Sequence, residues 1–262
     1  MTSLTRPRAL VLAASGTNRD REAAQALDLA GAEPEIVPLA ELRAGRRSLV
    51  DYQLLIVPGG FAYADALGAG KLLALDLQTF LAEEVSAFVL AGKPVLGVCN
   101  GFQALLKAGL LPQPSAPASA ATLTFNASGH FECRWVSLAP RSQVCVWTRG
   151  LEEPIYCPVA HGEGNFVLAG AALLAGLQAD DQVALVYVRP DGAPARGAYP
   201  HNPNGSVADI AGLCNPAGNV LGLMPHPEDH IFSYQHPRWA RGERGGLGLR
   251  LFEQGVRYAA QL

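Results

Sequence analysis

The stretch VLGVCNGFQ at residues 95–103 decides how the rest of the chain is interpreted. A short apolar run ends in Gly-x-Cys-x-Gly, and residues typical of a helix follow at once. This order matches the G-x-S-x-G elbow, in which a strand turns sharply into a helix with a nucleophile at the turn. Here the nucleophile is the thiol of Cys99, and the N-terminus of the following helix favours its thiolate. A buried structural cysteine at a strand end is the alternative that spacing alone leaves open.

Short apolar runs alternate with amphipathic stretches around this motif, a pattern typical of a parallel sheet covered by helices. We expect strands over 9–14, 54–57 and 94–98 and helices over 21–30, 72–90 and 102–108. After a Pro/Ser/Ala-rich insertion at 112–121, we expect strands over 122–125, 132–138, 144–148, 183–188 and 220–223, and a last helix over 247–260. The predicted fold class is α/β, in one domain over 1–262, with antiparallel strands closing over a mostly parallel sheet.

The composition excludes several classes of protein. Of 262 residues, 49% are apolar and 16% charged, with a net charge of -3, so the chain is not disordered and offers no basic surface for nucleic acid. The best candidate for a membrane span, 85–98, is interrupted by Gly92, Lys93 and Pro94, which argues against one. The apolar run at 9–14 is too short for a signal peptide. Five cysteines without a CxxC pair favour a reducing cytoplasm over a disulfide scaffold or a zinc site.

A candidate base and its orienting group occur in MPHPED at 224–229. His226 and Glu228 point to the same side if the chain is extended, and Pro225 and Pro227 each fix a φ angle. The carboxylate of Glu228 can then hold the imidazole of His226 in one tautomer. A proline-rich surface turn with a solvated pair is the alternative. The spacing of the nearby histidines gives no regular ligand face, which argues against a metal.

The turn PGGF at 58–61 follows the strand expected over 54–57. Its glycines leave N–H groups free to face a developing oxyanion. Because ligands bind outside the C-terminal ends of strands in open α/β sheets, Gly60, Cys99 and His226 are expected to meet at one edge. A glycine turn alone is weak evidence, and the convergence of three features is stronger. AHGEGN at 160–165 and YPHNPNGS at 199–206 are also polar, with ordinary turn chemistry as the alternative.

Together these residues resemble the class I glutamine amidotransferases, and most of all the glutaminase subunits of phosphoribosylformylglycinamidine synthases. The resemblance runs along nearly the whole chain, through GTNRDRE at 16–22, PGGFAYAD at 58–65, GVCNGFQ at 97–103, TLTFNASGHFECRW at 122–135, AHGEG at 160–164, NPNGS at 202–206 and MPHPE at 224–228. The Cys elbow and the His-Pro-Glu segment are common to the superfamily, whereas the three segments between them single out these subunits. Two departures stand out: Ala64 replaces the glycine of the family's PGGFxYGD, and the insertion at 112–121 lengthens the chain.

The resemblance implies a three-layer, flavodoxin-like fold and a Cys99–His226–Glu228 triad. It implies that the backbone N–H groups of Gly60 and Asn100 form the oxyanion hole. It also implies a set of residues that bind glutamine: Phe61, Gln103, His161, Gly162, Glu163 and Gly164. The implied reaction is hydrolysis of L-glutamine to glutamate and ammonia through a thioester on the cysteine.

The resemblance further implies that ammonia passes to a separate synthase subunit, with a small third subunit bridging the two in many members. The synthase uses ATP to convert formylglycinamide ribonucleotide into formylglycinamidine ribonucleotide in purine (IMP) biosynthesis. We expect no cofactor on this chain, which lacks a P-loop, so ATP and Mg²⁺ are expected on the partner. Other interpretations are a different class I amidotransferase, a free-standing γ-glutamyl thiol hydrolase, or a silent binding module, although all three triad residues are present.

Overall fold

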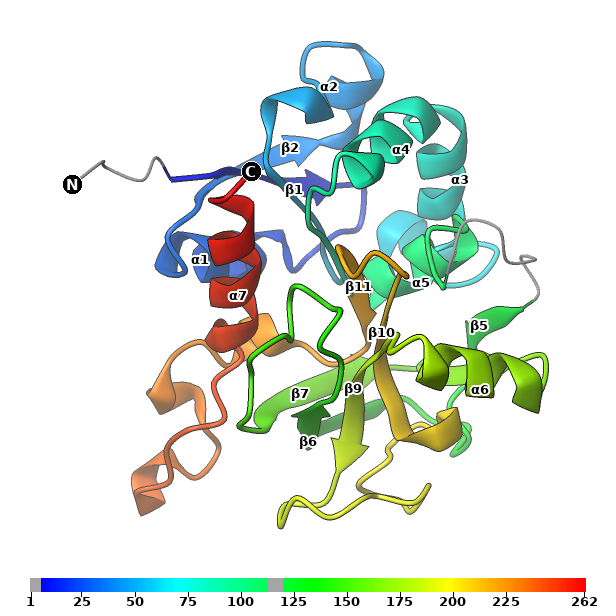
Figure 1. The fold of residues 1–262 in the computed structure, drawn as a ribbon, viewed down its shortest axis with the longest axis vertical. Coiled ribbons are helices and arrows are strands. Elements are labelled where there is room, and N and C mark those ends of the chain that lie inside the picture. The colour runs from blue at the N-terminus through cyan, green and yellow to red at the C-terminus, as the bar shows by residue number, and fades with distance from the viewer. Residues whose placement is uncertain (1–5, 113–119) are drawn as a thin grey trace.

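The structure is built from eleven strands and seven α-helices in the part of the chain that it describes (Figure 1). This computed structural model describes residues 6–112 and 120–262. The strands are β1 (Arg8–Ala13), β2 (Glu33–Pro38), β3 (Leu54–Val57), β4 (Val95–Val98), β5 (Ala121–Thr124), β6 (Glu132–Pro140), β7 (Ile155–His161), β8 (Asn165–Leu168), β9 (Val183–Val188), β10 (Ile210–Cys214) and β11 (Val220–Leu223). The helices are α1 (Asp20–Leu29), α2 (Leu39–Arg43), α3 (Lys71–Thr79), α4 (Ala82–Leu90), α5 (Asn100–Lys107), α6 (Ala171–Ala179) and α7 (Leu249–Ala259).

Nine of these strands form one mixed sheet in the order β2-β1-β3-β4-β11-β10-β9-β6-β7. The first five are parallel, and their order is that of a flavodoxin-like doubly wound sheet. The other four extend the sheet by antiparallel pairing, while β5 and β8 pair separately. The predicted fold class is therefore confirmed.

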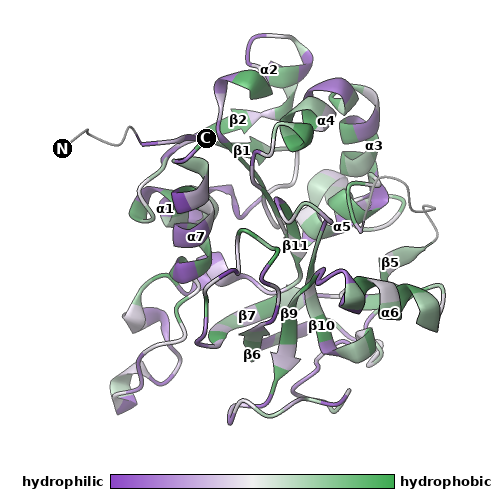
Figure 2. Cartoon of the chain, in the orientation of Figure 1, coloured by the Kyte–Doolittle hydropathy of each residue, from purple (hydrophilic) through white to green (hydrophobic). Residues whose placement is uncertain are grey.

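Helices cover both faces of the sheet (Figure 1). Helices α1 and α7 pack together on one side, and α3, α4 and α5 pack on the other. Strands β3, β4 and β11 are buried along their whole length, as expected for strands covered on both faces. Figure 2 shows the same distribution, with hydrophobic residues along the inner strands and hydrophilic residues in the outer loops and on the helix surfaces.

The register places the C-terminal ends of three strands side by side. Val57 of β3 lies opposite Gly97 of β4, and Val98 of β4 lies opposite Leu223 of β11. The residues that follow these strands therefore leave the same edge of the sheet. This register supplies the convergence that the sequence predicts for Gly60, Cys99 and His226.

The single helix predicted over 72–90 is wrong. The structure has two helices, α3 and α4, because the N–H groups of Phe80 and Leu81 both donate to the carbonyl of Asp76 and end α3. Glu83 and Glu84 lie in the first turn of α4, where negative charge favours a new helix N-terminus. The residues at the break include neither glycine nor proline, so the sequence offered no clear signal.

The strand predicted over 144–148 is also wrong, because this segment forms turns. Its backbone is held by a side chain: the Asp181 carboxylate accepts hydrogen bonds from the N–H groups of Gln143 and Val144, at 2.7 and 3.0 Å.

The antiparallel strands do not close over the parallel sheet as expected, because β10 pairs with β11 and continues the sheet edge to edge. Residues 113–119 of the predicted insertion lie outside the described residues.

The sequence patterns did not predict six of the helices and strands: β2, α2, β7, β8, α6 and β10. Strand β2 is EPEIVP, and its prolines are tolerated because it is an edge strand of the sheet.

Among the described residues, no helix is long and apolar enough to cross a membrane.

The close packing of α5 on β11 gives a testable prediction. A Cβ added at Gly222 of β11 would lie 2.0 Å from the ring of Phe102, which is fully buried. We expect Gly222→Ala to lower the free energy of unfolding by about 1–3 kcal/mol, measured by urea denaturation. The control is Gly176→Ala in α6, where nothing lies within 4 Å and the change should stabilise by about 0.5–1 kcal/mol. Equal stability of the two variants would contradict this packing.

Candidate active site

Cys99 lies at the sharp turn between β4 and α5. Its φ of 49° and ψ of −104° are unusual for a residue other than glycine, and such strain is typical of functional turns. The turn needs glycine on both sides: a Cβ at Gly101 would lie 1.9 Å from the carbonyl oxygen of Val57, and one at Gly97 would lie 2.5 Å from a methyl carbon of Leu105. The N–H of Cys99 donates to Leu223 over 2.8 Å. The predicted elbow geometry is present.

His226 and Glu228 form a buried pair after β11. Nδ1 of His226 lies 2.7 Å from Oε1 of Glu228, and the two residues are only 3% and 1% exposed. Burial alone would lower the pKa of His226, but the charge of Glu228 and the nearby sulfur of Cys99 raise it well above its ordinary value. Among the described residues, Nε2 of His226 has no hydrogen-bond partner. This nitrogen is therefore available to exchange a proton with a reacting group.

Two backbone N–H groups beside the thiol have no acceptor among the described residues: those of Gly60 and Asn100. Asn100 is the first residue of α5, where a helix has no internal acceptor to offer. Its side chain ties the two donors together, because Oδ1 accepts from the N–H of Ala62 at 3.1 Å and Nδ2 donates to Asp65 at 2.9 Å. The N–H groups of Gly60 and Asn100, predicted to form the oxyanion hole, are thus free. The side chain of Asn100 fixes their relative position by bonding the turn that follows Gly60.

Gly60, Cys99 and His226 line one pocket of about 50 Å³. Its lining residues are Asn18, Arg19, Gly60, Phe61, Cys99, Ala160 and His226. Of the residues predicted to bind glutamine, Phe61 is the one that lines it. Asn18, Arg19 and Ala160 were not predicted, although Asn18 and Arg19 follow the C-terminal end of β1, the same signal that located the other groups.

The other residues predicted to bind glutamine are not among those that line this pocket. Nε2 of Gln103 donates to the carbonyl of Glu163 over 2.7 Å, and its Oε1 accepts from Asn100 over 3.1 Å. Gln103 therefore fastens the loop that follows β7 to the first turn of α5. Direct contact of Gln103, Gly162, Glu163 or Gly164 with glutamine stays a prediction.

His161 is the centre of a buried polar network that joins three loops. Its Nδ1 lies 3.1 Å from Oδ1 of Asn126, and its Nε2 lies 3.4 Å from Nδ2 of Asn204. The same oxygen of Asn126 accepts from the N–H of Gly164 at 3.0 Å. Burial lowers the pKa of His161 to about 3, so its ring is neutral near neutral pH. Segments 125–131, 160–164 and 202–206, separated in the sequence, therefore form one unit whose inner residues are buried.

Ala64, which replaces the family's glycine, has a φ of 54°. Its neighbours Tyr63 and Asp65 also have positive φ, at 56° and 53°. Glycine adopts this backbone conformation with less strain than alanine. Alanine in place of the family's glycine thus adds local backbone strain to the turn that carries Gly60. Gly60 itself still lines the pocket.

Two further histidines, His230 and His236, are hydrogen-bonded to backbone groups. Nδ1 of His230 bonds the carbonyl of Tyr156, and Nδ1 of His236 accepts from the N–H of Arg238 at 3.1 Å. All five cysteines are free thiols. Across residues 6–112 and 120–262, no group of three or more His, Cys, Asp or Glu side chains is placed to hold a metal ion.

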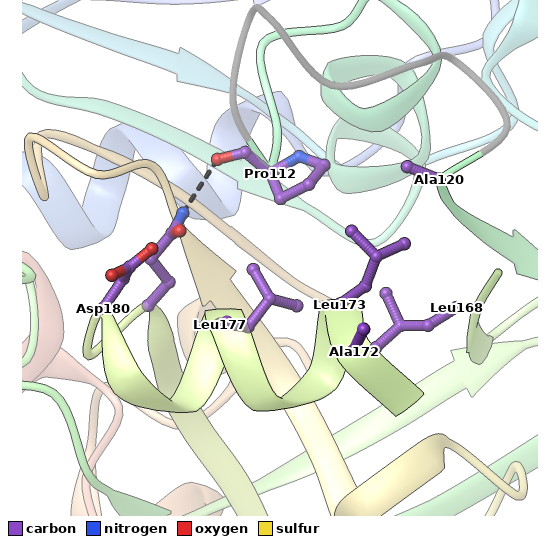
Figure 3. A pocket seen from close by; sticks show the side chains of 9 residues that line it. Pro112, Ala120, Leu168, Ala172, Leu173, Leu177 and Asp180 are labelled. Carbon is purple, nitrogen blue, oxygen red and sulfur yellow. Dashed lines mark hydrogen bonds between the residues drawn. The ribbon is translucent and has the colours of Figure 1, made fainter. Parts of the chain in front are cut away.

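A second pocket, of about 90 Å³, lies against α6 (Figure 3). Its described lining is mostly apolar, with Leu173 and Leu177 pointing into it. Gln182 also lines it and donates to the carbonyl of Pro112 over 2.9 Å, the bond drawn as a dashed line from Pro112 in Figure 3. Neither cysteine nor histidine is among these lining residues, so this pocket lacks the nucleophile and base of the first.

A family model described as a CobB/CobQ-like glutamine amidotransferase domain matches residues 6–259. The chain belongs to this family. The matched region contains Cys99, His226 and Glu228, so the recognised family and the pocket geometry agree on the class of chemistry.

Individual relatives extend over nearly the whole chain. It is 51% identical to the phosphoribosylformylglycinamidine synthase subunit PurQ of Treponema denticola, over 97% of this chain and 99% of that protein. It is 41% identical to the protein of the same name from Dehalococcoides mccartyi, over 99% of this chain and 100% of that one. Among solved structures, a chain of PurLQS from Thermotoga maritima matches with a TM-score of 0.75 and 34% identity, covering 97% of this chain and 99% of that chain.

The buried His161 predicts a pH-dependent stability. Its folded pKa of about 3 lies below the ordinary value of 6.5, so the unfolded chain takes up a proton that the folded chain cannot. Stability is therefore retained above pH 6.5 and lost as the pH falls from 6.5 toward 3. We expect the loss in unfolding free energy between pH 7 and pH 5 to be about 1–2 kcal/mol smaller in His161→Gln than in the wild type.

Urea denaturation at the two pH values measures this difference. The control is His130→Gln, which removes an exposed histidine from the neighbouring loop and should keep the wild-type pH dependence. The same pH dependence in His161→Gln and the wild type would show that the network does not hold His161 neutral.

Proposed function

We propose that this chain is the glutaminase subunit of a phosphoribosylformylglycinamidine synthase. It hydrolyses L-glutamine to glutamate and ammonia and supplies the ammonia to a synthase subunit. The observation that carries the chemistry is a single pocket that holds the Cys99 thiol, the unpaired Nε2 of His226 and the free N–H of Gly60. The relatives that match nearly the whole chain carry this subunit's name, which supports the choice among amidotransferases.

In the first half of the reaction, the thiolate of Cys99 attacks the side-chain amide carbon of glutamine. A C–S bond forms, and the carbonyl electrons move onto oxygen, which the N–H groups of Gly60 and Asn100 stabilise. Protonated Nε2 of His226 then gives its proton to the amide nitrogen as the C–N bond breaks. Ammonia leaves, and a γ-glutamyl thioester remains on the enzyme.

In the second half, water replaces ammonia. Neutral Nε2 of His226 takes a proton from water as the oxygen attacks the thioester carbon, and the same two N–H groups hold the oxyanion. The C–S bond breaks, and glutamate leaves. Glu228 keeps Nδ1 of His226 occupied throughout, which fixes the ring and stabilises its charged form.

The proposed partner is the ATP-dependent synthase subunit, in line with the assembled PurLQS of the related Thermotoga structure. We place ATP and Mg²⁺ on that partner and no cofactor on this chain. A small bridging subunit belongs to the same proposal. The partner would convert formylglycinamide ribonucleotide into formylglycinamidine ribonucleotide with the ammonia received.

Glutamate release from L-glutamine tests this function. We expect the purified chain to be strongly stimulated by the synthase subunits, ATP and formylglycinamide ribonucleotide. Cys99→Ala should lower this activity at least about 10³-fold because the nucleophile is gone. Glu228→Gln should retain a small residual activity. Cys133→Ala, which removes an exposed thiol, is the matched control and should behave as the wild type.

The same assay separates the alternatives. Brisk hydrolysis by the chain alone, indifferent to the synthase, would indicate a free-standing glutaminase or γ-glutamyl hydrolase. Full activity in Cys99→Ala would rule out the thiol mechanism.

A further inference from the structure

Arg19 lies at the edge of the catalytic pocket, directly beside the catalytic histidine. It lines the pocket together with Cys99 and His226. A Cβ added at Gly59 would lie 2.7 Å from Cε1 of His226 and 3.5 Å from Cγ of Arg19, so the arginine stem and the imidazole flank the same glycine. The backbone N–H of Arg19 also donates to Gly59 over 3.3 Å. Both the main chain and the side chain of Arg19 are thus fixed at the turn that carries Gly60.

The guanidinium of Arg19 is held on one side and open on the other. Nη1 lies 3.2 Å from Oε1 of Glu22 and 3.8 Å from Oδ1 of Asp229. Among the described residues, neither Nε nor Nη2 makes a hydrogen bond. These two N–H groups lie along one edge of the guanidinium, and such an edge fits the two oxygens of a carboxylate. The side chain is 37% exposed, so it is accessible to a small solute.

The position of Arg19 in the fold also favours contact with a ligand. The strand order reverses between β1 and β3, and ligands of doubly wound sheets bind at this switch point. Arg19 follows β1, Gly60 follows β3, and an isolated bridge between Thr17 and Gly60 joins the two loops. The guanidinium therefore lies where the part of a substrate that extends beyond the oxyanion hole would be placed.

Glutamine carries a carboxylate at a suitable distance from its reacting amide. Three carbon atoms, Cγ, Cβ and Cα, separate the amide carbon from the α-carboxylate. When the amide lies at Cys99, the carboxylate therefore lies toward the edge of the pocket. Among the residues that line the pocket, Arg19 is the permanent cation, since the charge of His226 is already paired with Glu228.

We propose that Arg19 binds the α-carboxylate of L-glutamine through Nε and Nη2 and so selects free glutamine over γ-amides that lack this carboxylate. This role rests on the proposed glutaminase function. Glu22 and Asp229 are positioning residues that hold the guanidinium by its other side. Neither contacts the substrate.

Substrate selectivity tests this role. The assay compares kcat/KM for ammonia release from L-glutamine and from 4-aminobutanamide, which is glutamine without its α-carboxylate, using the full chain with its synthase subunits. We expect Arg19→Gln to lower kcat/KM for glutamine by about 10- to 100-fold, mainly through KM, and to change that for 4-aminobutanamide by less than about twofold. If turnover of the analogue is too slow to follow, the Kd values of both compounds for the Cys99→Ala chain give the same comparison.

Two further variants make the result specific. Arg19→Lys keeps the charge without the planar fork and should show an intermediate loss. Arg21→Gln, which removes an exposed arginine outside the pocket, should leave the selectivity unchanged. An equal loss for both substrates in Arg19→Gln would assign Arg19 a structural role and overturn the proposal. Failure of the proposed function is distinguishable, because the wild type itself would then release no glutamate or would release it without any response to the synthase subunits.

Discussion

The close approach of α5 to β3 is the constraint on which the rest of the site depends. Without a side chain at Gly101, the first turn of α5 lies against the carbonyl of Val57. Directly before this contact, Cys99 has its strained conformation, and the side chain of Asn100 bonds the turn after β3. The thiol and the oxyanion donors are therefore positioned by the same contact, and backbone strain is retained because the surrounding sheet fixes it.

Buried polar side chains connect the elbow at Cys99 to the neighbouring loops. Asn100 connects the elbow to the turn after β3, and Gln103 connects it to the loop after β7. That loop is held in turn by Asn126 and by the neutral His161. Since each of these groups is buried and hydrogen-bonded, losing one leaves its partners unsatisfied, which is costly inside a protein. Segments 125–131, 160–164 and 202–206 thus act as the support of the loop that Gln103 connects to the elbow.

Local sequence patterns were sufficient to predict that Gly60, Cys99 and His226 meet at one pocket. The elbow depends on glycines at fixed offsets from Cys99, and the spacing of His226 and Glu228 brings their side chains together in a short segment. The parallel register then aligns the strand ends. The break between α3 and α4 was missed because it depends on the carbonyl of Asp76 rather than on a breaking residue. The polar network could not be derived either, since it requires the pairing of β6 with β7 and of β5 with β8.

The proposed reaction passes through a thioester on Cys99, which mass spectrometry of the trapped intermediate can detect. The chain, assembled with its synthase subunits, is incubated with isotopically labelled L-glutamine, quenched in acid and digested for peptide mapping. We expect a labelled γ-glutamyl group on the peptide that contains Cys99 and on no other cysteine peptide. Labelled glutamate produced without any adduct on Cys99, or an adduct on a different cysteine, would contradict it.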